Sequence, residues 1–295
     1  MKLLIINCFI HDKNKQGLMS MLTYLQLQGK IDDYKFGSHG DIPDYDVIYS
    51  PSQGLNTALY PNKKFLFGPH FSVFPDHNQL KSLTTKNSVY LQPSEWVIQL
   101  WQTMGATKFL PLRSLPFPVN TDKFQPTVSK EKRENTFIYY KRRQPEELKQ
   151  LQTFLQQQPD LKVRNCRVFD YTQGYSETDY LHYLQNCKFG IVLDAHESQG
   201  FAIEEALASD VPLLVWNAHS MNQEYNSNYQ AIPCTSIPYW DRRCGEYFHH
   251  LAELPATYQR FQTKLANQEY HPRQYIMENL STEKCAERLI ALLSV

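Results

Sequence analysis

The sequence predicts an α/β protein of two domains, each built on a parallel β-sheet. Short apolar runs alternate with stretches of helical spacing along most of the chain, the pattern of a parallel sheet covered by helices. The 295 residues suit two domains of roughly 100 to 200 residues each. Four prolines within residues 111–126 separate two series of these alternations. We therefore expect a first domain at 1–115, a second at 116–280, and a last helix at 281–295 that packs back toward the first domain.

The first domain contains apolar runs of strand length separated by turns and helical stretches. Residues 17–28 place Leu18, Leu22 and Leu25 on one helix face. Ser94 stands at the N-cap of a second helix that reaches residue 104. The expected strands are residues 2–9, 47–49, 65–67 and 88–91.

The second domain alternates more regularly. Because connections between parallel strands almost always close right-handed, this alternation predicts a doubly wound, Rossmann-like sheet whose ligand lies at the carboxyl ends of the strands. The expected strands are 137–140, 162–168, 189–193 and 212–216; the expected helices are 145–156, 177–185, 202–208, 246–254, 256–267 and 282–293, the last capped by Ser281.

Charge and composition exclude several classes of protein. Thirty basic residues balance thirty acidic ones, so no uniform positive field attracts nucleic acid or an anionic membrane. The six cysteines form no CxxC pair, which predicts reduced thiols and no zinc site. The first ten residues lack the features of a signal peptide, and no apolar run approaches the roughly 20 residues of a membrane span. A cytoplasmic protein is expected.

Two carboxylates flank a glycine turn where a strand of the second domain ends and a helix begins. Glu197 lies in the loop, and Glu205 lies about one turn into the helix. The amides of Gly200, Phe201 and Ala202 begin this helix, and such free amides together with the helix dipole form an anion site suited to a diphosphate. Glu197 can then accept hydrogen bonds from sugar hydroxyls and Glu205 from ribose hydroxyls. The alternative is that both acids merely favour the helix dipole.

A basic triplet follows the first strand of the second domain. Lys141 and Arg142 stand at the strand end, with Arg143 as an alternative to Arg142. A basic pair at this position can stabilise the negative charge that a phosphate leaving group gains. Neither a metal nor another cofactor is expected. The alternative for a basic triplet is a solvated surface.

The donor loop and its flanks resemble the family 4 glycosyltransferases, which carry Glu-x7-Glu around Gly-Phe and a following Glu-Ala. That family has the GT-B fold, with two Rossmann-like domains whose parallel sheets face a central cleft. Residues 115–126 are similar to its interdomain segment but lack the usual glycine. A group of short bacterial and viral glycosyltransferases is similar over about residues 112–292. The stretches that match this group are 196–200, 211–217, 236–246 and 272–275, whereas those that match family 4 are 197–201, 205–208 and 211–215.

The resemblance implies roles for named residues. Glu197, Lys141, Arg142 and His70 are the expected catalytic residues. His70 follows a first-domain strand, where this fold often places a histidine that faces the sugar, although a lone histidine is more often structural. His11, Lys13 and Asn14 are weaker candidates. The expected donor-binding residues are Ser198, Gln199, Gly200, Phe201, Ala202, Glu205 and, as a base-stacking ring, Phe169.

These expectations describe a hexosyltransferase that moves a sugar, with retention and without a metal, from a UDP- or GDP-sugar to a hydroxyl group. A glycan, a lipid-linked sugar, a protein or a modified nucleic acid can supply that hydroxyl, although the charge of the chain does not point to nucleic acid. Two alternatives remain open. One is a GT-B nucleotide-sugar epimerase, and the other is a module that binds nucleotide sugars without turnover.

Overall fold

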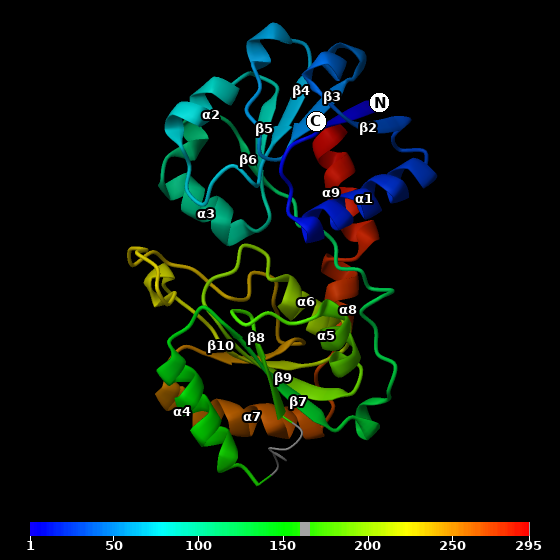
Figure 1. Cartoon of the computed structure of the whole chain (residues 1–295). Helices are drawn as coiled ribbons and strands as arrows, with labels where there is room; N and C mark the ends of the chain where they lie inside the picture. Colours follow the sequence, from blue (N-terminus) through cyan, green and yellow to red (C-terminus); the bar gives the residue numbers. More distant parts are fainter. Residues whose placement is uncertain (160–165, 295) are drawn as a thin grey trace. The chain divides into compact units, whose positions relative to one another are not determined.

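The computed structural model describes residues 1–159 and 166–294, and the chain divides into two compact units. Unit 1 comprises Met1–Pro118 together with the segment that begins at Leu280, and unit 2 comprises Val119–Asn279. The last helix thus belongs to the unit formed by the start of the chain. Figure 1 labels the elements of both units.

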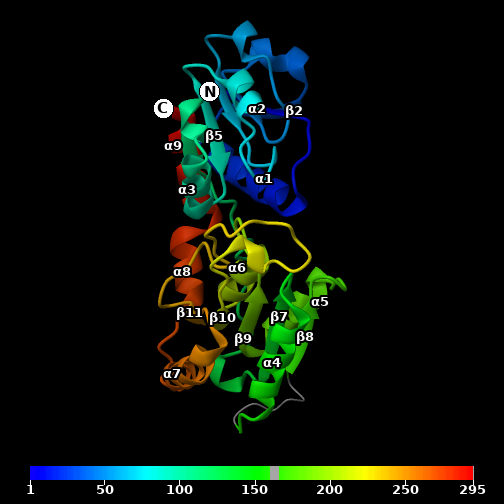
Figure 2. The same ribbon diagram turned by 90° about the vertical axis from the view of Figure 1, so that its left-hand side faces the viewer.

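Unit 1 is built on a six-stranded parallel sheet of order β2-β1-β3-β4-β5-β6. Residues Leu3 to Ile6 of β1 are fully buried, as a central strand covered on both faces requires. Helix α9 lies against α1, which Figure 1 shows. The strands are β1 Lys2–Ile6, β2 Asp33–Gly37, β3 Val47–Ser50, β4 Lys64–Phe67, β5 Ser88–Gln92 and β6 Leu112–Ser114; the helices are α1 Asp12–Leu27, α2 His77–Leu83, α3 Glu95–Thr103 and α9 Thr282–Ser294, most of which Figure 2 labels.

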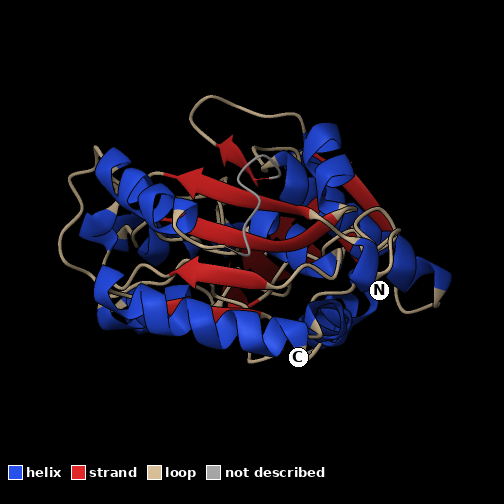
Figure 3. Cartoon of the chain, turned by 90° about the horizontal axis from the view of Figure 1, so that it is seen from below, coloured by secondary structure: helices blue, strands red, loops and turns tan. Residues whose placement is uncertain are grey.

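Unit 2 is built on a five-stranded parallel sheet of order β11-β10-β9-β7-β8. Figure 3 shows its strands running between helices. The strands are β7 Asn135–Lys141, β8 Cys166–Asp170, β9 Cys187–Asp194, β10 Leu213–Trp216 and β11 Gly245–Phe248; the helices are α4 Pro145–Gln156, α5 Glu177–Leu184, α6 Phe201–Ala208, α7 Leu254–Ala266 and α8 Pro272–Asn279.

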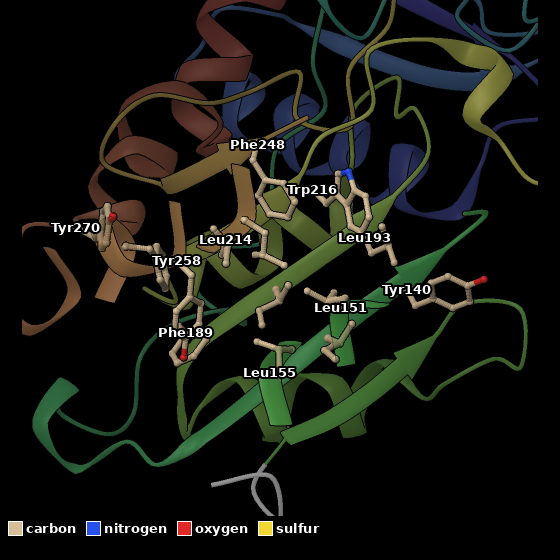
Figure 4. Packing of buried hydrophobic residues seen from close by; sticks show 14 residues of the cluster. Tyr140, Leu151, Leu155, Phe189, Leu193, Leu214, Trp216, Phe248, Tyr258 and Tyr270 are labelled. Atoms are coloured by element: carbon tan, nitrogen blue, oxygen red, sulfur yellow. The ribbon is translucent and has the colours of Figure 1, made fainter. Parts of the chain in front are cut away.

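The two faces of the unit 2 sheet bury different helices. On one face, Leu151 and Leu155 of α4 and Tyr258 of α7 pack on alternate residues of β7, β9 and β10, as Figure 4 shows. On the other face, Phe137 contacts Tyr180 of α5. This alternation follows from the two-residue period of a strand. The two-domain α/β fold with parallel sheets is therefore confirmed.

Several element predictions need correction. The first helix begins at Asp12 rather than at residue 17, so Gly17 lies inside it. The helix expected at 246–254 is wrong, because Gly245–Phe248 forms β11 and pairs in parallel with β10. Gly245 has φ +143°, and a Cβ there would stand 1.8 Å from the carbonyl oxygen of Leu213, so this close pairing requires glycine. Residues 162–165 of one expected strand lie outside the described residues, and its remainder belongs to β8.

Candidate functional site

The candidate site of unit 2 forms where β7 and β9 end side by side. Lys141, the last residue of β7, is the register partner of Asp194, the last residue of β9. The chain then passes through residues 195–200 and enters helix α6. Because both strands run in the same direction, parallel pairing brings the basic residues and the acidic loop to one edge of the sheet.

Gly200 makes the turn from this loop into α6. It is the N-cap of the helix with φ +92°, a left-handed conformation that glycine adopts without strain. The first backbone hydrogen bond of the helix runs from the Glu204 amide to the Gly200 carbonyl oxygen at 3.1 Å. The amides of Phe201 and Ala202 precede that bond and lie in the first turn, where an α-helix supplies no acceptor.

Glu197 is the centre of the site. Its side chain is only 14% exposed, and its Oε1 pairs with Lys141 and lies 3.1 Å from Nη2 of Arg142. Its amide donates to the Thr235 carbonyl oxygen at 3.0 Å, which fixes the loop. Burial opposes ionisation of Glu197, but the charges of Lys141 and Arg142 outweigh it and lower the pKa of this carboxyl.

Lys141 is held from several sides. Burial disfavours its charged form, yet the negative charge of Glu197 outweighs burial and raises the pKa of the ammonium. Its Nζ also lies 4.5 Å from the ring centroid of Tyr171, a distance that allows a cation–π contact. Lys141 is therefore a fixed positive charge at the strand end.

Arg142 has an unusual backbone for a residue with a side chain, with φ +52°. Its Nη2 donates to the His196 carbonyl oxygen at 2.9 Å, and its Nη1 pairs with Glu224 at 3.4 Å. Its own carbonyl oxygen accepts from the Tyr225 amide at 2.9 Å. Such a conformation costs free energy and persists only where surrounding contacts hold it.

Arg143, the alternative to Arg142 in the sequence, does not belong to the site. Its side chain is fully buried and lies over the ring of Trp216. It donates to the Asp194 carbonyl oxygen at 3.1 Å and pairs with Glu147 at 2.5 Å. Arg143 therefore ties the end of β9 to helix α4.

Ser198 and Gln199, two of the expected donor-binding residues, precede α6, and Glu205 lies within it. Ser198 is exposed, whereas Gln199 is buried and donates from Nε2 to Glu204 at 3.1 Å. Glu205 is only 5% exposed. Its charge contributes to the raised pKa of Tyr175, although burial is the main cause of that shift.

The expectation that Phe169 stacks on a base is wrong. Its ring is 1% exposed and packs against Phe137, Tyr175 and Tyr180 in the core. Tyr171, two residues farther, is half exposed and lies beside Lys141. The alternation of strand side chains points Phe169 inward, and the exposed aromatic ring comes after the strand has ended.

His70 lies in unit 1, after β4. Its Nε2 is 3.0 Å from the side-chain nitrogen of Asn14 in α1, and its ring meets Phe9 edge-on. Burial, and then the charge of His11, lower the pKa of His70 to about 4, so the ring is neutral at pH 7. Two of the weaker candidates, His11 and Asn14, thus lie beside it. Lys13, the third, is in the first turn of α1.

Sequence reasoning missed three residues of the site. Asp194 is fully buried beside Glu197, and Glu224 contacts both Arg142 and the Nδ1 of His196, at 3.3 Å for the latter. His196 lies in a matching stretch of the sequence, but the sequence predicts no role for it. Asp194 carries a detectable signal, an acid at the end of an apolar run, but Glu224 lies in a long loop that no local pattern places.

No metal site emerges from the acidic residues. Among the described residues, no group of three or more His, Cys, Asp or Glu side chains could hold a metal ion. The Asp44-Tyr45-Asp46 stretch has the Asp-x-Asp spacing of some metal sites, but Asp46 immediately precedes β3 and so lies at the amino end of a strand. Its carboxylate accepts from the Lys2 amide at 2.8 Å. In the part of the chain that the structure describes, no helix is long and apolar enough to cross a membrane.

Comparison with known proteins identifies the fold. No family model and no curated protein matches the sequence. Among solved structures, the trehalose-6-phosphate synthase from E. coli bound with UDP-2-fluoro glucose is similar over 100% of this chain and 99% of its own, with TM-score 0.63 and 10% identity. AviGT4, a glycosyltransferase involved in avilamycin A biosynthesis, is similar over 99% and 96%, with TM-score 0.55 and 12% identity.

A third structure, sucrose-phosphate synthase from Thermosynechococcus elongatus, is similar over 97% of this chain and 79% of its own, with TM-score 0.52 and 12% identity. These likenesses show that the chain has the GT-B fold, as the resemblance of its donor loop implied.

Proposed function

We propose that this protein is a glycosyltransferase that moves a hexose-like sugar from a nucleotide-diphosphate donor, a UDP- or GDP-sugar, to a hydroxyl group. The observation that carries the proposal is the convergence of Lys141 and Arg142 on Glu197, beside the first turn of α6. Fold neighbours support it, because one is a glycosyltransferase and another was solved with a UDP-sugar analogue. Fold alone does not determine function, so the site carries the argument.

The charges of the site match the chemistry of this transfer. The bond between the anomeric carbon and the diphosphate oxygen breaks, and a bond from the acceptor oxygen to that carbon forms. The acceptor proton passes to the departing phosphate oxygen, so no strong protein base is needed. Lys141, Arg142 and the first amides of α6 stabilise the charge that the diphosphate gains. Retention and independence of metal ions belong to the same proposal.

Glu197 and Glu205 bind different parts of the donor. Glu197 holds the sugar hydroxyls, and Glu205 holds the ribose hydroxyls, because each ionised carboxylate is an acceptor for paired O–H donors. His70 of unit 1 stays a predicted catalytic residue. The acceptor is a glycan or another hydroxyl compound.

A panel of UDP-, GDP- and ADP-sugars tests the proposal. Each donor is incubated with the protein, with and without simple glycoside acceptors, and free nucleotide diphosphate and sugar products are measured by NMR. Release of the diphosphate with transfer or slow hydrolysis supports a glycosyltransferase, and the anomeric proton coupling of the product reports retention. An isomerised donor would instead indicate an epimerase, and binding without turnover a binding module. Lys141→Ala is the control for contaminating activity.

A further inference from the structure

Asp194 lies beside Glu197 in the site and forms no ion pair with any residue that the structure describes. It ends β9, its side chain is fully buried, and its Oδ1 accepts from the Ala195 amide at 2.7 Å. Its Oδ2 is buried and has no hydrogen-bond donor among the described residues. Within the same described part of the chain, the ammonium of Lys141 and the guanidinium of Arg142 pair with Glu197 and not with Asp194.

The backbone around Asp194 is rigid. Its carbonyl oxygen accepts from Nη1 of Arg143 at 3.1 Å and from Oγ of Ser236 at 3.1 Å. The same Ser236 hydroxyl lies 2.6 Å from the Ala195 carbonyl oxygen. These contacts keep the Asp194 carboxyl beside that of Glu197, close enough for a hydrogen bond between the two groups if one of them carries a proton.

Two carboxyl groups can share a hydrogen bond only if one of them carries a proton. Glu197 is the acceptor, because it holds both cations. A proton on Asp194 also satisfies the buried Oδ2, which otherwise lacks a partner. Complete burial raises the pKa of Asp194 well above its usual range, and the neighbouring charge of Glu197 raises it further.

We propose that Asp194 is an uncharged positioning residue, which donates a hydrogen bond to Glu197 and holds that carboxylate against Lys141 and Arg142. Glu197 and Glu224 balance the two cations when Asp194 is neutral. An ionised Asp194 would add a third negative charge and repel the diphosphate of a donor. The consequence for a donor rests on the proposed function, whereas the proton on Asp194 does not.

Groups from several elements face Asp194. Glu197 belongs to the loop after β9, and Lys141 and Arg142 to the end of β7. Among the described residues, Tyr139, Tyr175 and Arg143 also couple to Asp194 or contact it.

Infrared difference spectroscopy tests the proton directly. Asp194→Asn keeps an amide N–H donor toward Glu197 and a carbonyl oxygen toward the Ala195 amide. At pH 7 we expect a carbonyl band of a protonated carboxyl group in the wild-type protein that is lost in Asp194→Asn and retained in Asp179→Asn, whose parent side chain is exposed and pairs with Arg167. If Asp194→Asn kept every protonated-carboxyl band of the wild-type protein, the proposal would be overturned.

Isotope labelling keeps this test valid if the variant fails to fold. A 13C-labelled aspartate side chain shifts a band from Asp194 and leaves a band from buried Glu204, whose pKa is also raised by burial. Absence of any shifted aspartate band at pH 7 in the labelled wild-type protein would contradict a protonated Asp194.

Anion binding tests the positioning role, with inorganic pyrophosphate as the probe and calorimetry as the measurement. Asp194→Asn should bind pyrophosphate within about threefold of wild type and keep its pH profile, because the local charge is unchanged, whereas Asp194→Ala should bind less well. If Asp194 were ionised, Asp194→Asn would remove a negative charge and tighten binding by about tenfold or more. No pyrophosphate binding by wild type, with the infrared band present, would reject the proposed function and leave the proton on Asp194 established.

Discussion

Oε1 of Glu197 accepts from Nη2 of Arg142 at 3.1 Å and pairs with Lys141 through the same oxygen. The carboxylate proposed to hold the sugar therefore neutralises the cations proposed to hold the diphosphate. The diphosphate of a donor must displace Glu197 from these cations before the Glu197 carboxylate can bind the sugar. This arrangement separates the effect of Glu197 on binding from its effect on turnover.

Glu197→Gln should therefore strengthen nucleotide binding and lower turnover. Without the competing charge, Lys141 and Arg142 should bind UDP or GDP more tightly. Turnover should fall by about 100-fold or more, because stabilisation of the transition state by the charged group is lost. Calorimetry with the nucleotide and steady-state kinetics measure the two effects. Equal or weaker nucleotide binding together with near-normal kcat would remove Glu197 from the mechanism.

Lys141→Ala should lower turnover by about 100-fold or more, since the ammonium at the end of β7 would no longer stabilise the charge that the diphosphate gains. Lys149→Ala is the matched control, because Lys149 lies on α4 with its side chain 75% exposed. That variant should keep wild-type kinetics. Near-normal kcat in Lys141→Ala would assign the charge stabilisation to other groups.

Glu205→Gln should weaken donor binding more than it slows the chemical step, because a contact to the ribose is the same in the ground state and the transition state. We expect a higher KM and dissociation constant with a kcat close to that of wild type. Glu146→Gln, at an exposed position of α4, is the control. A Glu205→Gln protein with unchanged nucleotide affinity would argue against the ribose contact.

Much of the site can be predicted from sequence, because neighbouring parallel strands bring the residues at their carboxyl ends together. An apolar run that ends in Lys141 and another that ends near Glu197 must place both ends at one edge of the sheet if the strands are neighbours. The glycine at 200 likewise indicates the turn into a helix. These inferences need only strand order and direction.

Other features depend on tertiary contacts that no local pattern reveals. Residues 245–248 form an edge strand of four residues with two of them exposed or half-exposed, so the apolar signal of a strand is weak there. Glu224 reaches Arg142 through a loop of irregular structure. Phe169 and Tyr171 would face the same side of a continuous strand, and the end of β8 at Asp170 decides that only Phe169 is buried. Long-range packing therefore decided each of these positions.

His196 makes stability dependent on pH. Burial, and then the positive charge of Arg142, lower the pKa of His196 to about 4, whereas an unfolded histidine has a pKa of about 6.5. Between these values the unfolded chain binds the proton, so the contribution of His196 to stability is complete above about pH 6.5 and is lost as the pH falls toward 4. Over this pH range, the urea concentration at the midpoint of unfolding should fall less in His196→Gln than in the wild-type protein. His39→Gln, at an exposed position, should retain the wild-type loss, and an equal effect of both variants would contradict the prediction.

Arg143 should stabilise unit 2 rather than act on a donor. Its guanidinium is fully buried and bonds the Asp194 carbonyl oxygen and the Glu147 carboxylate. Because the side chain of Glu147 is 21% exposed, water compensates it in part, and removing Arg143 with its hydrogen bonds to charged and backbone groups costs about 2 to 3 kcal/mol. Arg143→Ala should therefore lower the free energy of unfolding by an amount of this order, measured by urea titration of tryptophan fluorescence. Arg167→Ala, which breaks an exposed pair with Asp179, should change stability little. If both variants unfolded at the same urea concentration, the buried contacts of Arg143 would contribute no more than a surface pair, and its position beside Lys141 and Arg142 would again favour a role in binding.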